Sequence, residues 1–391
     1  MSEKRTEKKE PLLRVEHLCC YFQKDGYEIK AVDDVSFDIR EGEVFGLVGE
    51  SGCGKTTTGR CIIQLYEISA GDIWFQGRHI SAGRGSYEAA IRKAREAWKA
   101  GHMDAAACKS LCKAEKSRMM EALKEAGDCD RRYAAERVRA VREAKENVSE
   151  FASRAAYRSA LRAAKRSRAA GGIQMIFQDS IASLNPRMTV RDIIAEGLII
   201  RGIRDKRVLE ERVKRMLELV GLSAEQGDRY PHEFSGGQRQ RIGVARALIM
   251  EPELVIADEP VSALDVSIQA QVINLLNDLK RELGLTILFI AHDLSVVHYL
   301  SDRIGVMYGG HLVELADADE LFSRPLHPYT RSLLSAIPMP DPHYEKKRQR
   351  LLYDPLLAHN YGDQKPEFRE VLPDHFVRCD EVELMRYRAD L

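Results

Sequence analysis

A glycine-rich run with a lysine and three threonines, GESGCGKTTT at residues 49–58, could bind phosphate. It fits the spacing G-x-x-x-x-G-K-[ST], with Gly49, Gly54, Lys55 and Thr56 at the fixed positions. In that pattern, backbone N–H groups surround the phosphates of a nucleotide and the lysine ammonium contacts them. A match this short also arises by chance, so the neighbouring motifs must decide between a phosphate loop and a flexible turn.

Two adjacent acids, Asp258 and Glu259, end the apolar run ELVIAD and begin the next turn. Beside a phosphate loop, the first carboxylate could hold Mg²⁺ and the second could polarise an attacking water molecule. Taken alone, the pair could equally well cap a buried strand. Its value as evidence therefore depends on the loop upstream.

Four further features carry little weight one by one. A Ser-Gly-Gly-Gln run precedes a basic helical pattern, where N–H groups at the helix start could bind an anion or the glycines could simply begin the helix. A histidine follows an apolar run, where a lone histidine is usually structural, and a glutamine follows QMIF. The residues concerned are Ser235, Gly236, Gly237, Gln238, His292, Gln178 and Asp265, the last of which ends a Ser-Ala-Leu-Asp run.

The hydrophobic pattern predicts the elements that must position these residues. The apolar run EVFGLVG leads into the glycine loop and a helical pattern follows it, which is the context that a phosphate loop requires. Strand-like runs occupy 12–47 and 71–80, and strand texture resumes at 171–180. Helical patterns at 189–221 and 236–250 are followed by the strands LVIAD and TILFIAH. This alternation predicts an α/β core with a largely parallel sheet.

A basic segment interrupts the α/β pattern over 82–171. It holds 22 Lys and Arg against 12 Asp and Glu, a net charge of +10, and contains no proline, which favours long helices. It could contact an acidic partner surface or anionic lipid headgroups, or be a solvated hairpin without a ligand. Cys108 and Cys112 lie four residues apart, with His102 and Cys129 nearby, so a metal site is a third alternative, although the spacing fits no established pattern.

Length, composition and net charge limit the classes of protein to which the chain can belong. The 391 residues are 44% apolar and 31% charged, enough for two or three domains or for one large domain with additions. Lys plus Arg equals Asp plus Glu at 60 each, so no global charge draws the chain toward nucleic acid. The eight cysteines form no extracellular framework, which favours a reducing cytoplasm. The first ten residues hold no apolar signal region, and no apolar run is long enough to span a membrane.

Taken in order, the phosphate loop, the glutamine, the Ser-Gly-Gly-Gln run, the acid pair, the Ser-Ala-Leu-Asp run and the histidine resemble the ATP-binding cassette (ABC) ATPases. The resemblance covers roughly residues 12–335 apart from 82–171. It implies a P-loop ATPase core: a mainly parallel sheet, an antiparallel β subdomain and a helical signature subdomain, here with a helical insertion. Ribosome-acting relatives usually carry two cassettes in one chain, whereas this chain holds one set of motifs.

Two stretches narrow the resemblance. FQDSIASLNPRMTV and HPYTRSLLSAIP are similar to the oligopeptide/dipeptide/nickel importer branch, and most like the F-type ATPase subunits of oligopeptide permeases. Residues 336–391 would then be the C-terminal tail of that family. Some members carry a C-terminal cysteine cluster for an iron–sulfur centre. Only Cys379 lies in that region here, so we do not expect the cluster.

The resemblance implies ATP and Mg²⁺ as ligands and a role for each motif. Lys55 would contact the β- and γ-phosphates, Glu259 would polarise the water, and His292 would contact the γ-phosphate. Thr56, Gln178 and Asp258 would surround Mg²⁺. Tyr21 would stack on adenine, unless it is simply a strand aromatic. The full nucleotide set is Tyr21, Gly49, Glu50, Ser51, Gly52, Cys53, Gly54, Lys55, Thr56, Thr57, Gln178, Asp258 and Asp265, with Ser235, Gly236, Gly237 and Gln238 directed toward the ATP of a partner subunit.

The family implies partners as well. We expect an ATPase that powers peptide uptake through two transmembrane permease subunits, paired with a second and different ATPase chain on the cytoplasmic face of the membrane. An extracytoplasmic solute-binding protein would deliver the cargo, and no nucleic acid is expected. Nickel or another small solute is the alternative cargo. The alternative of a different class is a soluble ABC ATPase acting on DNA or ribosomes, which the basic segment superficially suggests.

Overall fold

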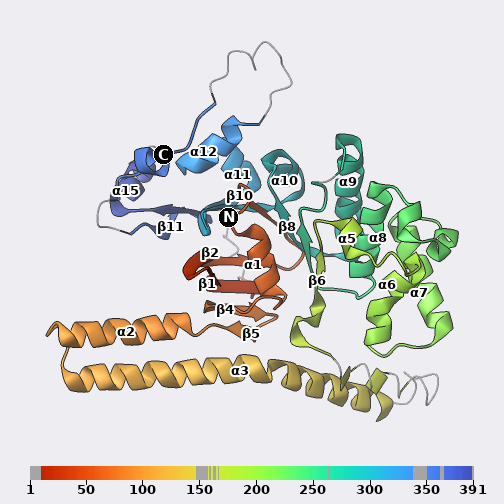
Figure 1. The fold of residues 1–391 in the computed structure, drawn as a ribbon, viewed down its shortest axis with the longest axis horizontal. Coiled ribbons are helices and arrows are strands. Elements are labelled where there is room, and N and C mark those ends of the chain that lie inside the picture. The colour runs from red at the N-terminus through yellow and green to blue at the C-terminus, as the bar shows by residue number, and fades with distance from the viewer. Residues whose placement is uncertain are drawn as a thin grey trace, which may run out of the picture.

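Two β-sheets packed face to face form the centre of the molecule in a computed structural model, and helices cover the outer face of the larger sheet (Figure 1). The structure describes residues 10–146, 157, 160–161, 164–165, 167–262, 264–337, 350–361 and 365–389. Strands and helices alternate along most of this length, so the predicted α/β class is confirmed.

The smaller sheet is antiparallel, with strands in the order β2-β1-β4-β5. Its strands are β1 (Leu13–Lys24), β2 (Tyr27–Ile39), β4 (Ala70–Phe75) and β5 (Arg78–Ala82). Alternating apolar residues turn one face inward, so that Leu13 and Val15 share a core with Leu288 and Ile290 of the larger sheet. This burial ties the two sheets into one structural unit.

The larger sheet has eight strands in the order β11-β12-β10-β9-β3-β8-β7-β6. The five strands from β9 to β6 pair in parallel, and those from β9 outward to β11 pair antiparallel. Every residue of β3, β7 and β8 is buried, as expected for parallel strands covered on both faces. The strands are β3 (Val44–Val48), β6 (Ile173–Ile176), β7 (Leu254–Asp258), β8 (Thr286–Ala291), β9 (Arg303–Tyr308), β10 (His311–Asp317), β11 (Glu367–Leu372) and β12 (His375–Cys379).

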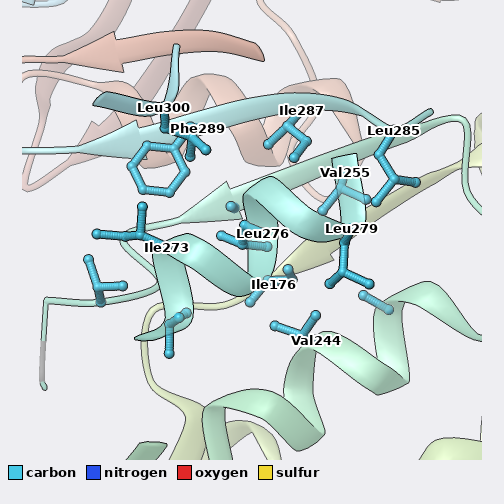
Figure 2. Packing of buried hydrophobic residues seen from close by; sticks show 14 of the residues in the cluster. Ile176, Val244, Val255, Ile273, Leu276, Leu279, Leu285, Ile287, Phe289 and Leu300 are labelled. Atoms are coloured by element: carbon cyan, nitrogen blue, oxygen red, sulfur yellow. The ribbon is translucent and has the colours of Figure 1, made fainter. Parts of the chain in front are cut away.

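Most of the helices cover the outer face of this sheet or form a separate group beside β6, whereas α1, which follows the glycine loop, packs between the two sheets. Figure 2 shows Leu276 and Leu279 pointing from their helix toward Val255 and Ile287 on the sheet. The helices are α1 (Lys55–Ile62), α5 (Ser180–Ser183), α6 (Val190–Ile200), α7 (Lys206–Leu219), α8 (Gly236–Leu248), α9 (Val266–Leu283), α10 (Leu294–Leu300), α11 (Ala318–Ser323), α12 (Pro328–Ser335), α14 (Pro355–Ala358) and α15 (Glu381–Ala389). Helices α5 to α8 form the group beside β6 (Figure 1).

The basic segment begins with two helices, α2 (Gly85–Lys99) and α3 (Ala105–Glu146), which lie side by side below the small sheet (Figure 1). We call α2 and α3 the hairpin. It meets the core through α2, which contacts β4, and through α3, whose Cys129 is buried in the core shared by the two sheets. Glu136 of α3 also pairs with Arg78 of β5 at 2.7 Å, and Asp130 accepts a bond from the Ala169 N–H. The predicted helical insertion is confirmed.

The structure bears on two further questions, whether the hairpin could hold a metal and whether any helix could span a membrane. Among the described residues, no three His, Cys, Asp or Glu side chains gather as a metal site would require. No helix within the described ranges combines the length and apolar composition needed to cross a bilayer. The boundaries at residues 82, 171 and 336 stay predictions.

The described residues after Ile337 form more regular structure than their sequence pattern predicts. Residues from Ile337 onward are proline-punctuated and weakly patterned, yet β11 and β12 extend the large sheet and α15 packs against them. Strand β12 pairs with β10 through Val377 opposite Glu314. The end of the chain is thereby attached to the strands beside β3, which leads into the glycine loop.

Candidate active site

The glycine loop joins β3 to α1, as the motif predicts. Gly54 caps α1 with φ = 107°, in the left-handed region. A Cβ there would lie 2.3 Å from the Ala31 carbonyl oxygen, and one on Gly49 would lie 2.1 Å from the Met307 carbonyl oxygen. The tight loop therefore requires glycine at both places, and its backbone ends at the N–H groups of a helix N-terminus, which favour an anion.

Lys55 lies inside the loop and is almost completely buried. Its Nζ donates to the carbonyl oxygens of Gly49 and Glu50, at 2.7 and 2.8 Å, and lies 3.7 Å from Cys53 Sγ. These neutral acceptors hold the ammonium in the loop, and no carboxylate of the described residues pairs with it. A positive charge is thus available within the loop for an anionic ligand.

Asp258, at the end of β7, is linked to the helix that follows the loop. Thr56 Oγ1 donates to Asp258 Oδ1 at 2.8 Å, although 202 residues separate them. Burial raises the pKa of Asp258, opposed by the Thr56 hydroxyl and by the positive charge of Arg60. Its second oxygen, Oδ2, is buried and has no hydrogen-bond partner among the described residues. A hard cation at this point would satisfy that oxygen.

Glu259 meets two side chains from distant segments. Gln178 Nε2 donates to Glu259 Oε2 at 3.0 Å, and His292 Nδ1 lies 3.3 Å from the same oxygen. The Glu259 backbone is in the left-handed region, with φ = 43°, and its N–H donates to the Ile290 carbonyl at 2.8 Å. An uncommon conformation fixed by a neighbouring strand is typical of a functional position.

These residues come together because their strands are parallel. The loop, the acid pair and His292 follow β3, β7 and β8, whose carboxyl ends meet at one edge of the sheet. Gln178 follows β6, the next strand along. Of the predicted residues, the structure brings together Gly49, Glu50, Ser51, Gly52, Cys53, Gly54, Lys55, Thr56, Thr57, Asp258, Glu259, Gln178 and His292.

The Ser-Gly-Gly-Gln run lies elsewhere in this single chain. Ser235 caps α8, and its Oγ accepts from the Gln238 N–H at 3.3 Å while Gln238 Oε1 accepts from the Ser235 N–H at 3.0 Å. Gly237 lies against α9, where a Cβ would come within 2.5 Å of Ile268 Cγ2. Within the described part of the chain, none of Ser235, Gly236, Gly237 and Gln238 is hydrogen-bonded to the loop.

Asp265 and Tyr21 also lie apart from the acid pair. Asp265 caps α9, and bonds from the Ser267 hydroxyl and the Ile268 N–H lower its pKa. Tyr21 is half-buried on β1 and its hydroxyl donates to Asp33 Oδ1 at 2.6 Å. The Lys30 ammonium lies 5.1 Å from the Tyr21 ring centroid. Stacking of Tyr21 on a base stays a prediction.

The glycine loop also contacts Tyr329, a residue that the sequence did not predict at the site. The Tyr329 hydroxyl, in α12, accepts a hydrogen bond from the Glu50 N–H at 3.0 Å. Tyr329 belongs to the His-Pro-Tyr-Thr stretch, whose pattern indicated only the family. No spacing signal could have joined two residues that are 279 positions apart.

A surface groove adjoins Gln178. It encloses about 800 Å³ between β6, α1 and the helical group, and its lining includes Phe177, Arg246 and Met250. Leu65 and Ile200 on its wall are 58% and 65% exposed. Exposed apolar side chains around a groove mark a surface suited to a protein partner.

Family models match most of the chain. One described as "ABC transporter" matches residues 32–150 and 147–262, and one described as "Oligopeptide/dipeptide transporter, C-terminal region" matches 313–361. The oligopeptide transport ATP-binding protein OppF of Bacillus subtilis is 48% identical, over 97% of this chain and 99% of the relative. The dipeptide transport ATP-binding protein DppF of Lactococcus lactis is 42% identical, over 92% and 91%.

Solved structures share the fold. The cbiO1 protein of Clostridium perfringens, part of the complex cbiONQ, superposes with a TM-score of 0.53 at 21% identity, over 83% of this chain and 96% of that one. The cassette MJ0796, solved as a dimer bound to ADP and Pi, gives 0.52 at 19% identity, over 78% and 98%. At these identities the likeness establishes the architecture alone.

Proposed function

The chain belongs to the ABC transporter family of ATP-binding proteins, and on that premise we propose that it is the ATP-hydrolysing subunit of an importer for oligopeptides or dipeptides. The predicted ABC-type core and ATPase class are confirmed by the family and fold matches. The observation that best supports the site is the meeting of Lys55, Asp258, Glu259 and His292 at the carboxyl ends of three parallel strands.

The residues present fit ATP with Mg²⁺. Thr56 and Asp258 offer two adjacent oxygens, and one oxygen of Asp258 lacks a partner among the described residues. Gln178 is hydrogen-bonded to Glu259, the residue that follows Asp258. Bound Mg²⁺ would neutralise charge on the phosphate oxygens. Thr56, Gln178 and Asp258 would hold it, and the N–H groups of residues 52–57 would surround the phosphates.

The chain's own groups then have distinct tasks. Lys55 would turn from the loop carbonyls to the phosphate oxygens, a short movement because its Nζ already lies within the loop. The Glu259 carboxylate would accept a hydrogen bond from the attacking water and orient it. Gln178 and His292 fix the Glu259 carboxylate, and His292 would contact the γ-phosphate.

The site requires a second subunit to be complete. Among the described residues, Ser235, Gly236, Gly237 and Gln238 make no hydrogen bond to this chain's own loop, and we propose that they face the ATP of a partner ATPase. The MJ0796 cassette was solved as a dimer, which is the assembly that this proposal requires. Asp265, at the start of α9 and close to Leu264 beside Gly236, would lie at the same interface. We propose a partner of different sequence, as the family implies.

The groove beside Gln178 is the proposed docking site for a permease subunit. A segment seated there would touch Gln178, which is bonded to Glu259. A movement of the nucleotide site would thus be transmitted to the permease, because Gln178 would contact both Glu259 and the docked segment. The protein would lie peripherally on the cytoplasmic face, with two permease subunits as partners and a solute-binding protein acting indirectly.

Reconstitution of the full complex in vesicles tests this function. ATP hydrolysis should rise when a peptide-loaded solute-binding protein is added, and the Glu259→Gln complex serves as the inactive control. Stimulation by a nickel-loaded binding protein in place of the peptide-loaded one would support the alternative cargo. Failure to co-purify with permease subunits, together with stimulation of ATPase activity by DNA or ribosomes, would overturn the importer assignment.

A further inference from the structure

Tyr329 connects the C-terminal region, here the chain from β10 onward, to one peptide group of the phosphate loop. The Gly49–Glu50 peptide is planar, so its carbonyl and its N–H turn together. Its N–H donates to the Tyr329 hydroxyl at 3.0 Å, and its carbonyl accepts from Lys55 Nζ at 2.7 Å. A rotation of this peptide would break both bonds, so Tyr329 and Lys55 hold it from opposite sides.

The tyrosine is itself held rigidly. Its side chain is 1% exposed and its ring packs on Tyr308 and Tyr353, at centroid distances of 4.5 and 5.3 Å. Burial raises the pKa of Tyr329, so the hydroxyl stays neutral and can accept the Glu50 N–H. Buried rings leave little freedom for the hydroxyl to move away from the loop.

The start of α12 is fixed to the large sheet. His327 caps the helix, with its Nδ1 accepting from the Tyr329 N–H at 3.1 Å. Burial lowers the pKa of His327 to about 3, which keeps that nitrogen free to accept. The buried Glu314 carboxylate on β10 accepts from the Leu326 and His327 N–H groups, at 2.7 and 3.1 Å. A continuous chain of hydrogen bonds therefore runs from β10 to the loop.

We propose that Tyr329 is a positioning residue for ATP binding, which makes the C-terminal region part of the nucleotide site. Through its bond to the Glu50 N–H, it presets the Gly49–Glu50 peptide and with it the loop that receives the phosphates. The inference rests on the proposed nucleotide role of residues 49–57.

The effect should fall on affinity more than on turnover. Without the hydroxyl, the Glu50 N–H loses its partner and the loop becomes free to sample other shapes before ATP arrives. Glu259, which orients the water, makes no contact with Tyr329 among the described residues. We therefore expect Tyr329→Phe to weaken ATP binding about tenfold, ~1.4 kcal/mol, and to raise KM with kcat nearly unchanged.

Tyr353→Phe is the matched control. It removes one hydroxyl from the same aromatic group, but that hydroxyl contacts His359 Nε2 at 3.0 Å and does not reach the loop. ATP affinity is measured by calorimetry on the full chain, KM and kcat on the assembled transporter, and the ligand-free melting temperature on each variant. We expect wild-type affinity for Tyr353→Phe and similar ligand-free melting temperatures for both variants.

Three results would overturn the inference: wild-type affinity in Tyr329→Phe, equal weakening in both variants, or a loss of affinity that follows only from a lower ligand-free melting temperature. The last two would make Tyr329 a packing residue. Failure of the proposed nucleotide role of residues 49–57 has a different signature, because the wild-type chain itself would then bind no ATP. The two failures are thus distinguishable in one series of titrations.

Discussion

Two regions, the hairpin and the C-terminal region from β10 onward, meet the strands that carry the active site in different ways. The hairpin is attached through ion pairs such as Glu136 with Arg78 and through Cys129 and Tyr133, which pack on the core shared by the two sheets. Within the described residues it makes no hydrogen bond to the loop or to the acid pair. The C-terminal region extends the large sheet and reaches the loop through Tyr329.

The difference shows that closeness along the chain does not indicate closeness to the site. The hairpin lies between the loop and Gln178 in sequence, whereas Tyr329 is 279 residues from Glu50. Buried hydrogen bonds, not sequence position, couple a region to the site, because only a held donor or acceptor can restrict the loop. We therefore expect the two regions to differ sharply when each is altered.

Glu259→Gln should have the largest effect of all the variants, because Glu259 orients the attacking water and lies in neither of the two regions. Removing the charge that orients water should reduce hydrolysis by roughly 10²–10⁴-fold while ATP still binds and traps a closed dimer. Phosphate release by the assembled complex measures the loss. Glu259→Gln should cause the same loss of hydrolysis in a variant whose hairpin has been replaced by a linker. Wild-type hydrolysis would exclude Glu259 from this role.

Glu314→Ala should have the next largest effect, on the C-terminal side. This carboxylate is fully buried and accepts bonds from Leu326, His327 and His375, which would all lose their partner. We expect the free energy of unfolding to fall by roughly 3–5 kcal/mol, as when a buried pair loses one member. Denaturant titration measures it.

Glu320→Ala is the control for that experiment. Its carboxylate is partly exposed and lies 3.8 Å from His375 Nδ1, so the expected change is below about 1 kcal/mol. An equal fall in the free energy of unfolding in the two variants would mean that the hydrogen bonds of Glu314 do not contribute more to stability than the contact of Glu320.

Lys55→Ala tests the other side of the Gly49–Glu50 peptide. Removing the ammonium should weaken ATP binding by roughly 10–100-fold, the range for a hydrogen bond to a charged group. Combined with Tyr329→Phe, the two losses should not add, because both side chains act on one peptide. Calorimetry measures each affinity. Unchanged affinity in Lys55→Ala would contradict the phosphate-loop assignment.

Replacement of 83–170 by a short Gly/Ser linker should have the smallest effect on the site. We propose that this segment is an accessory module, so the variant should fold and bind ATP within about twofold of wild type, while assembly or membrane association could suffer. Calorimetry and permease pulldown measure the two properties. A folded variant that cannot bind ATP would place the hairpin in the nucleotide site. Stoichiometric zinc or iron in the intact protein would instead point to a metal role for its cysteines.

Much of the architecture could be predicted from local pattern. The runs EVFGLVG, LVIAD and TILFIAH became β3, β7 and β8 because unbroken apolar runs of this length suit strands buried on both faces. Strands β11 and β12 were not foreseen, since they are short and lie among prolines. Their place in the sheet depends on pairing with β10, which no neighbour in sequence reports.

Local sequence specifies which chemical groups are present and which turn each occupies, because a glycine loop, a strand end or a helix cap depends on residues a few positions away. Which of these groups meet depends on the fold. The parallel sheet brought Gln178 and His292 to Glu259, left Asp265 as a helix cap apart from them, and placed Tyr329 on Glu50. These contacts join segments tens to hundreds of residues apart, and their geometry follows from how strands pair and cores pack, which local sequence does not encode.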